Sequence, residues 1–392
     1  MVELQSIFEQ HGKGYRESRK LPANHRKAMW CIEAYRTSVL GGHTSQCDEC
    51  GYTQISYNSC RNRHCPKCQT LSKEQWIEDR KQDLLSVQYF HVVFTIPDII
   101  NSIAYQNQKV VYSILFKAVS ETLLELAADK KYLGAQLGFT SILHTWGQNL
   151  MHHPHIHCIV PGGGLSNCNK WVDAQKKFFI PVRVLSQVFR GKFMYYLKKA
   201  HHESKLKFYG DIAHLTLEQD FQSIINTLYG IDWVVYCKEP FKSSEHVIEY
   251  LGRYTHRVAI SNQRILKLEE GHVTFKWRDY KDDNKEKVMT LSAMEFIRRF
   301  LIHVLPDRFV KIRHYGLLGN RNRHSKLKLC KKLTGTRFRI VPKERLSVQQ
   351  MMLKLTGKDI SKCPCCGCGR LHRALGSTPK SISPPVNPGV TA

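Results

Sequence analysis

The 392-residue chain lacks several features that would place it in other protein classes. No run of about 18 apolar residues occurs, and the most apolar stretch is interrupted by Pro97 and Asp98, so we expect no transmembrane helix. The N-terminus, MVELQSIFEQ, lacks the basic and then apolar segments of a signal peptide. No GxxxxGK[ST] motif is present, so nothing indicates an ATP-driven motor. These absences predict a cytoplasmic protein.

Acidic residues are scarce relative to basic ones. The chain has 33 Asp and Glu against 59 Lys and Arg, a formal net charge of +26. Its 42% hydrophobic content is sufficient for a folded core, and its length suits two or three domains. An excess of positive charge this large in a folded protein favours a polyanionic partner, most often nucleic acid. We therefore expect a nucleic-acid-binding protein; the alternative is a ribosome-associated or merely basic protein.

The pattern of strands and helices predicts an α+β fold. A buried strand, YFHVVFTIP, is followed by a segment with apolar residues at helical spacing and then by two strands joined by a short turn. This order indicates an antiparallel sheet with helices packed on it. The predicted strands are residues 89–97, 139–148, 155–160, 210–217 and 233–237, with a hairpin at 272–277 and 287–291; residues 101–131 are the predicted helix.

Cysteines are numerous, and most of the 14 gather in two clusters, which in a reducing compartment favours metal sites over disulfides. In the first cluster, the pairs Cys47/Cys50 and Cys65/Cys68 have the spacing of two zinc knuckles, so we predict one structural Zn²⁺ site with these four ligands. Cys60, His64 and His43 are surplus candidates that could replace a ligand or pack nearby. Arg61, Arg63 and Lys67 lie between the ligands and are predicted to contact DNA phosphates.

The segment HHPHIHCIV contains a His-x-His pair at the start of a predicted strand. His155 and His157 would point to one face of that strand, where two imidazoles can bind a divalent cation together. Gln148, seven residues earlier, could add an oxygen ligand across the hairpin, and His144 is a competing third ligand. Such a site would hold Mg²⁺ or Mn²⁺ as a Lewis acid. The alternative is a pair of surface histidines.

A predicted helix, residues 244–258, carries a tyrosine stripe. His246, Tyr250 and Tyr254 follow one another at intervals of four, so they share a helix face, and Arg253 and Arg257 flank them. Such stripes are usually core, but basic neighbours are unusual for a core. A phenol, whose ordinary pKa is about 10, needs a base or a cationic field to become a nucleophile.

The C-terminal region is basic. Residues 298–345 carry 15 Lys and Arg and only two acids, Asp307 and Glu344. We predict contacts with the DNA backbone here, including Arg321, Arg323 and Lys326; the alternative is a solvated helix face. A second, tighter cysteine cluster follows, with Cys363, Cys366, Cys368 and His372 as candidate ligands of a second zinc ion. Residues 379–392 are rich in Pro and Ser and are predicted to be a disordered tail.

Three segments in series resemble a known family. The segments YNSCRNRHCPKCQ, HTWGQNLMHHPHIHCIVPGGGL and EYLGRYTHRVAISN resemble the insertion sequence 91 family of transposases, which are HUH nucleases (histidine–hydrophobic–histidine) with two tyrosines. The resemblance extends from about residue 43 to residue 325. It implies rolling-circle DNA transposition, in which one strand is cut and rejoined through a 5′-phosphotyrosine intermediate.

The resemblance also implies roles for individual residues. Tyr250 and Tyr254 would be the nucleophiles, and His155 and His157 would hold the metal ion that polarises the scissile phosphate. Gln148 occupies the place of the third, polar ligand in this superfamily. Exchange of one phosphodiester for another is nearly energy-neutral, so catalysis would consist of positioning and charge stabilisation.

The predicted organisation is therefore an N-terminal helical and zinc-binding domain (residues 1–88), an HUH nuclease domain with the tyrosine helix (89–265), a basic DNA-binding region with the second cysteine cluster (266–378) and the tail (379–392). Two alternatives stay open from the sequence. A plasmid replication initiator or relaxase would use the same chemistry, and a non-catalytic zinc-dependent protein would only bind DNA. The resemblance also implies a protein of the bacterial cytoplasm that is associated with the nucleoid through its DNA.

Overall fold

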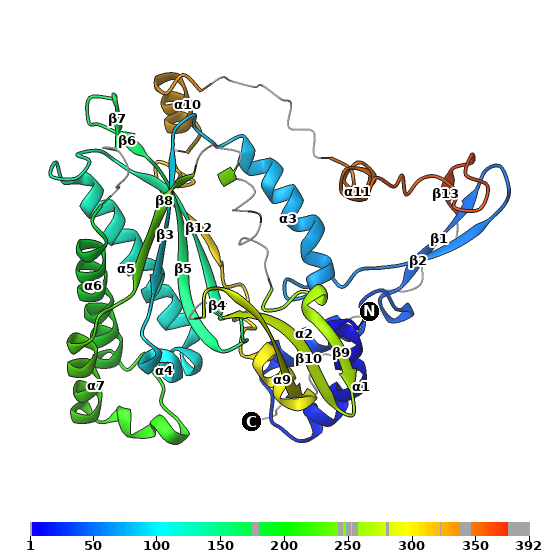
Figure 1. Cartoon of the computed structure of the whole chain (residues 1–392), viewed down its shortest axis with the longest axis horizontal. Helices are drawn as coiled ribbons and strands as arrows, with labels where there is room; N and C mark the ends of the chain where they lie inside the picture. The colour runs from blue at the N-terminus through cyan, green and yellow to red at the C-terminus, as the bar shows by residue number, and fades with distance from the viewer. Residues whose placement is uncertain are drawn as a thin grey trace. The chain divides into compact units, whose positions relative to one another are not determined.

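The computed structural model describes residues 2–174, 180–241, 246–247, 252, 258–279, 282–321, 323–336 and 346–374. The chain divides into two compact units, each assembled from segments that are distant in sequence. The sheet unit comprises residues 77–255 and 305–340, and the terminal unit comprises residues 1–76, 256–304 and 341–392. The α+β fold with antiparallel sheets and packed helices is confirmed (Figure 1).

The sheet unit is built on five antiparallel strands in the order β12-β4-β5-β3-β8. Strand β5 is central, with β4 on one side and β3 on the other. Four of these strands were predicted and are confirmed, with modest differences at their ends: β3 (Tyr89–Thr95), β4 (Gly138–Trp146), β5 (His152–Pro161) and β8 (Val235–Phe241). The fifth, β12 (Ile312–Gly316), was not predicted.

One face of this sheet is apolar and packs on helices. Phe94 of β3 and Ile156 and Cys158 of β5 are fully buried there, and the ring of Phe94 lies edge-on to Phe189 with centroids 5.1 Å apart. Burial of each large side chain stabilises the fold by about 1.5–3 kcal/mol. The covering helices are α5 (Gln108–Ala128) and α6 (Val182–His202), as Figure 1 shows. Helices α4 (Asn101–Gln106) and α7 (Glu218–Gly230) lie nearby. The short elements of this unit are η2 (Asp98–Ile100), β6 (Gly163–Leu165) and β7 (Trp171–Asp173).

Strand β12 joins this sheet from a later part of the chain. The sequence analysis assigned it to a separate basic region, because its five residues, IRHYG, carry no strand pattern long enough to detect. Helix α10 (Arg323–Leu333) follows, and its Leu327 and Cys330 are buried with Leu85 and Leu317. Part of the basic region therefore belongs to the sheet unit.

The prediction of a strand at residues 210–217 was wrong. Residues Gly210–Thr216 form a 3₁₀ helix, η3, in which only Leu215 is buried. A strand on a packed sheet would bury alternate side chains, and this segment does not do so. The left-handed φ of Gly210, +57°, also breaks an extended backbone at its first residue.

Helices and a hairpin sheet form the core of the terminal unit. Helix α1 contacts α2 and α9, and the rings of Phe8 and Phe300 lie 5.5 Å apart, edge to face. The predicted hairpin is confirmed as β10 and β11, and its Phe275 packs on Phe296 of α9. The bounds are α1 (Leu4–Glu17), α2 (Ala23–Glu33), η4 (Asn262–Arg264), β9 (Ile265–Glu269), β10 (His272–Asp279), β11 (Lys285–Ser292) and α9 (Ala293–Leu301).

A second small sheet in the terminal unit combines both ends of the chain. Strand β1 pairs antiparallel with β2 on one side and with β13 on the other. The bounds are η1 (Ser38–Leu40), β1 (Gly42–Cys47), β2 (Thr53–Tyr57), α11 (Val348–Thr356) and β13 (Leu371–Arg373); helix α3 (Pro66–Lys81) contains the boundary between the two units. The predicted tail at 379–392 lies outside the described residues.

The junction of β12 with β4 yields a stability prediction. Gly316 has φ +57°, and a Cβ there would lie 1.8 Å from the carbonyl oxygen of Leu137. We expect Gly316→Ala to lower the free energy of unfolding by about 3 kcal/mol, from backbone strain plus overpacking. Gly335→Ala is the matched control, since its φ is +62° but its surroundings are open, and should cost about 1 kcal/mol. Denaturant unfolding measures both; equal losses would show that β12 does not pack as described.

Candidate functional site

The opposite face of the five-stranded sheet carries a histidine cluster. His155 and His157 lie two residues apart on β5, so both point to this face, as predicted. His144 of β4 is the direct cross-strand partner of His155. Because cross-strand partners share a face, the register brings all three imidazoles together.

The three rings are close enough to hold one ion. Ring centroids lie 4.6 Å apart for His144 and His157, 4.8 Å for His155 and His157, and 5.5 Å for His144 and His155. One ring nitrogen from each lies within 4.8 Å of the other two. His144 and His157 are buried, whereas His155 is half-buried. The cluster therefore has the chemistry of a three-nitrogen metal site with one more accessible side.

Hydrogen bonds at Nδ1 orient two of these rings. His155 Nδ1 lies 2.6 Å from the carbonyl oxygen of His153, which can only accept, so this nitrogen carries the proton. His157 Nδ1 lies 2.8 Å from Nε2 of His91. In His155, Nε2 is then the nitrogen that can ligate a metal. In His157, the contact at Nδ1 orients the ring and leaves Nε2 available as the ligand when Nδ1 carries the proton.

His91 was not identified from the sequence. It lies on β3, two residues from Val93, which pairs with His157, so it shares the histidine face. Its side chain is buried, and this burial, with smaller contributions from Lys238 and His155, lowers the pKa of His91 to about 3. A neutral His91 can accept the Nδ1 proton of His157. The sequence showed His91 only as a lone histidine within an apolar strand. Its contact with His157 becomes visible only from the strand register.

The third ligand was left open between Gln148 and His144, and the structure brings His144 to the pair. Gln148 lies in the connection between β4 and β5 and is half-buried. Its role as a ligand stays a prediction.

The predicted nucleophiles Tyr250 and Tyr254, with their neighbours Arg253 and Arg257, lie outside the described residues. Within the predicted helix, residues 246, 247 and 252 are described, and all three are helical.

The cysteines group differently from the prediction. Cys47 and Cys50 lie with Cys363 and Cys366, whose four sulfurs are all within 4.8 Å of one another. The predicted set that joined Cys47 and Cys50 to Cys65 and Cys68 was therefore wrong, because sequence spacing does not reveal a partner more than 300 residues away.

The predicted second zinc set was wrong for the same reason. Cys363 and Cys366 lie with Cys47 and Cys50, while Cys368 is outside this group. His372 Nε2 instead lies 3.1 Å from a carboxylate oxygen of Asp48.

A second thiol cluster consists of Cys60, Cys65 and Cys68, with Cys60 and Cys68 sulfurs 3.5 Å apart. Hydrogen bonds from Cys60 and Cys65 lower the pKa of Cys68 to about 3, and hydrogen bonds with Cys65 and Cys68 raise the pKa of Cys60 strongly. All three groups can be thiolates together only if a cation offsets their repulsion. These residues thus fit a structural metal ion.

The basic side chains beside the thiols differ in availability. Arg61 is exposed, with a left-handed φ of +51°, and Arg63 is half-buried. Lys67 forms an ion pair with Glu3 and lies 5.3 Å from the centre of the Tyr35 ring. Arg61 is therefore the residue of this group whose position best suits contact with a phosphate.

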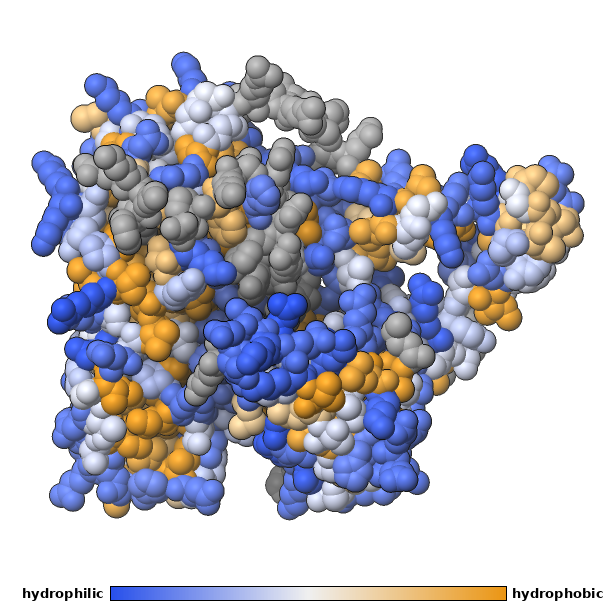
Figure 2. All heavy atoms as spheres, viewed as in Figure 1, coloured by the Kyte–Doolittle hydropathy of each residue, from blue (hydrophilic) through white to orange (hydrophobic). Residues whose placement is uncertain are grey.

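The basic side chains in and beside helix α10 also divide into paired ones and exposed ones. Arg323 forms an ion pair with Asp83, and Lys326 donates to Gln136 at 2.6 Å, so both hold the sheet unit together. Arg321, just before the helix, is exposed, as are Lys328 and Lys332. Hydrophilic side chains also predominate on the face of the molecule in Figure 2. These exposed cations suit contacts with a DNA backbone.

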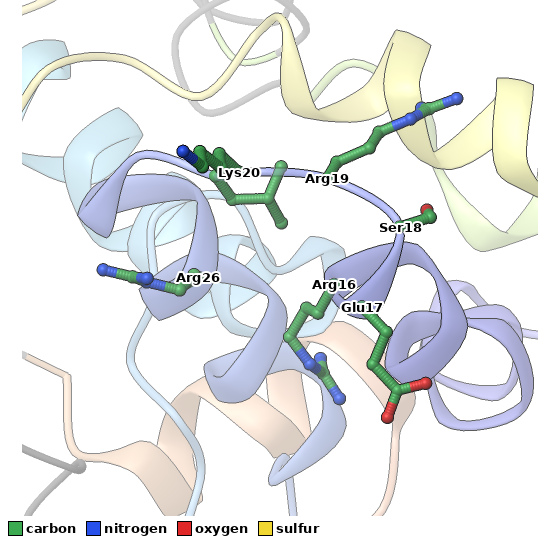
Figure 3. Close-up of a pocket in the computed structure, with 7 residues that line it drawn as sticks. Arg16, Glu17, Ser18, Arg19, Lys20 and Arg26 are labelled. Atoms are coloured by element: carbon green, nitrogen blue, oxygen red, sulfur yellow. The ribbon is translucent and has the colours of Figure 1, made fainter.

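A basic pocket at the end of α1 was also missed by the sequence analysis. Figure 3 shows Arg16, Glu17, Ser18, Arg19, Lys20 and Arg26 around it, and its volume is about 610 Å³. Arg16 pairs with Glu33 at 2.5 Å, while Arg19 stacks on the ring of Tyr15 at 4.6 Å. The charge of this pocket suits an anion such as a phosphate.

None of the helices in the described ranges combines the length and the apolar composition that a membrane span requires.

Two family models match the chain. Residues 7–96 match the IS91-type "Transposase zinc-binding domain", and residues 138–326 match the model described as "Putative transposase". The second match contains the histidine cluster residues His144, His155 and His157.

Two relatives match over most of the chain. The "Putative transposase y4qJ" of Sinorhizobium fredii is 48% identical over 376 residues, which are 94% of this chain and 94% of that protein. The "Transposase for insertion sequence element IS801" of Pseudomonas savastanoi pv. phaseolicola is 27% identical over 291 residues, 73% of this chain and 68% of that protein. With the zinc-binding and transposase matches, these relatives establish that the chain belongs to the IS91 family of transposases.

Proposed function

We propose that this transposase cuts and rejoins single-stranded DNA at transposon ends by metal-assisted attack of tyrosine on phosphorus, and so drives rolling-circle transposition. The observation that carries the proposal is the cluster of His144, His155 and His157 on one face of a rigid sheet. The motif EYLGRYTHRVAISN, with Tyr250 and Tyr254, supplies the nucleophiles.

The residues of the cluster fit a divalent cation. His144, His155 and His157 would hold it through ring nitrogens, and Gln148 could add an oxygen. When bound, such an ion acts as a Lewis acid that polarises the scissile phosphate. Three imidazole ligands favour Mn²⁺ over Mg²⁺, since Mg²⁺ prefers oxygen ligands.

The protein's own part in the reaction is to position the tyrosine and to move its proton. One phenol loses its proton and its oxygen attacks phosphorus, so that a phosphotyrosine ester forms at the 5′ end. The bond from phosphorus to the 3′ oxygen breaks, and that oxygen takes up a proton to give a 3′-OH. A second 3′-OH then attacks the phosphotyrosine and releases the phenol. Two tyrosines allow one subunit to hold a cut end while it makes a second cut.

The transposon-end DNA, the target strand and the DNA contacts at Arg61, Arg321, Lys328 and Lys332 are part of the same proposal. In each unit taken by itself, exposed cations can contact the backbone of a single strand without reading its sequence. Both relatives are named as transposases, which favours transposition over plasmid replication as the process served.

The chemistry is tested by trapping the covalent intermediate. Labelled single strands copied from the DNA that flanks the gene are mixed with the purified protein and Mn²⁺, Mg²⁺ or EDTA, then run on a denaturing gel. We expect a shifted, metal-dependent band that is absent in the double variant Tyr250→Phe/Tyr254→Phe.

The matched control is Tyr195→Phe/Tyr229→Phe, which changes two exposed tyrosines of the sheet unit and should keep the band. Tight DNA binding without a covalent band on either flanking strand would favour the binding-only hypothesis instead.

His91 yields a second prediction. Because His91 Nε2 lies 2.8 Å from His157 Nδ1 and can accept its proton when His157 Nε2 ligates a metal, His91→Ala should lower the affinity of the cluster for Mn²⁺ by about 10–100-fold. Cleavage by His91→Ala should largely recover at saturating Mn²⁺. The Mn²⁺ affinity of His91→Gln, which keeps an acceptor, should lie between those of the wild type and His91→Ala. The Mn²⁺ concentration dependence of cleavage measures this. His314→Ala, a histidine on β12 that contacts Thr140, is the control; a similar loss in both variants would argue against a positioning role for His91.

A further inference from the structure

Two turns with the same sequence pattern and backbone geometry lie near opposite ends of the chain. Cys47-x-x-Cys50 is followed by Gly51 and Cys363-x-x-Cys366 by Gly367, with φ of +72° and +71° at these glycines. Each glycine N–H donates to the carbonyl oxygen of the first cysteine of its turn, at 3.3 Å and 3.0 Å. The chain thus forms the same knuckle twice.

The two knuckles face each other. The sulfurs of Cys47 and Cys366 lie 3.7 Å apart, and those of Cys50 and Cys363 lie 3.6 Å apart. A tetrahedron with Zn–S bonds of about 2.3 Å has sulfurs about 3.8 Å apart, whereas a disulfide bond is about 2.05 Å long. The spacing is that of four ligands around one ion.

Backbone donors also point at these sulfurs. The N–H of Cys365 lies 3.4 Å from Cys363 Sγ, and the N–H of Gly369 lies 3.3 Å from Cys366 Sγ. Such donors stabilise a thiolate, the form that binds metal. A Cβ at Gly369 would lie 2.4 Å from Cys47 Sγ, so this glycine permits the close approach of the two ends.

We propose that Cys47, Cys50, Cys363 and Cys366 bind one zinc ion, so that the segment of residues 346–374 completes the N-terminal zinc-binding domain. The matching zinc-binding family model ends at residue 96 and contains only half of this ligand set. The remaining thiols of that domain, Cys60, Cys65 and Cys68, form the separate cluster.

Among the described residues, a short strand ladder and a few hydrogen bonds connect the two ends besides the four thiols. Strand β13 pairs with β1 over three residues, and Asp48 Oδ1 accepts from the N–H of Arg370 at 2.7 Å. His372 adds a contact with Asp48. A three-residue strand is marginal alone. A zinc ion that closes a loop of more than 300 residues would therefore be the main connection between the two ends of the terminal unit.

The test uses the full-length chain and follows zinc content and thiol reactivity together. Zinc per chain is measured by mass spectrometry of the metal, and alkylation by iodoacetamide is located by peptide mass spectrometry. We expect Cys363→Ser/Cys366→Ser to lose one zinc ion per chain and to make Cys47 and Cys50 reactive. Cys60, Cys65 and Cys68 should stay protected, and the fully buried Cys158 reports that the sheet unit is folded.

The matched control is Cys365→Ser/Cys368→Ser, which changes the two exposed cysteines of the same segment and should alter neither readout. An unchanged zinc content with Cys47 and Cys50 still protected in Cys363→Ser/Cys366→Ser would overturn the proposal.

A measurement on the wild-type chain does not depend on the folding of any variant. Zinc is withdrawn with increasing concentrations of a chelator, and alkylation is followed at each step. If one ion holds all four thiols, Cys47, Cys50, Cys363 and Cys366 become reactive in a single step. Release of the N-terminal pair and the C-terminal pair at different chelator concentrations would refute the shared site.

Discussion

Strand β5 is hydrogen-bonded to β4 on one edge and to β3 on the other, and its register with both determines what the two faces of the sheet can do. Ile156 and Cys158 point to the helices, while His155 and His157 point to the opposite face. A slip of one residue would exchange these sets, since the side-chain period of a strand is two. The apolar packing against α5 and α6 therefore also holds the histidines in place.

The same strand register also brings a further histidine, His91, into contact with the cluster. His144 lies opposite His155, and His91 lies diagonally from His157 on the next strand. Burial keeps His91 neutral, which suits an acceptor for the His157 proton, and the carbonyl oxygen of His153 plays the same part for His155. In the proposed reaction, rigid strands and not loops would carry the histidines that phosphoryl chemistry requires to be positioned accurately. This is consistent with a reaction in which bond energies nearly balance and catalysis depends on placement.

Local patterns in the sequence predicted much of this arrangement. Buried apolar runs rich in β-branched and aromatic residues predicted β3 and β5, and the His-x-His pair could be assigned to one face without any knowledge of the fold. What the sequence could not supply was pairing between distant segments. The contact of His91 with His157 follows only from the β3–β5 register. Strand β12 can be recognised only from its pairing with β4, and the partner of Cys47 in its thiol cluster, Cys366, only from the folded structure. The segment 210–217 was predicted as a strand, but it forms a 3₁₀ helix in which only Leu215 is buried.

The central claim is that His144, His155 and His157 bind a divalent metal ion through their ring nitrogens. Crystals of the protein soaked in Mn²⁺, with diffraction data collected at an energy where manganese scatters anomalously, test it most directly. The account predicts one anomalous peak within about 2.3 Å of a nitrogen of each of the three histidines. Manganese peaks only elsewhere on the protein, with the histidine cluster empty at saturating Mn²⁺, would contradict it.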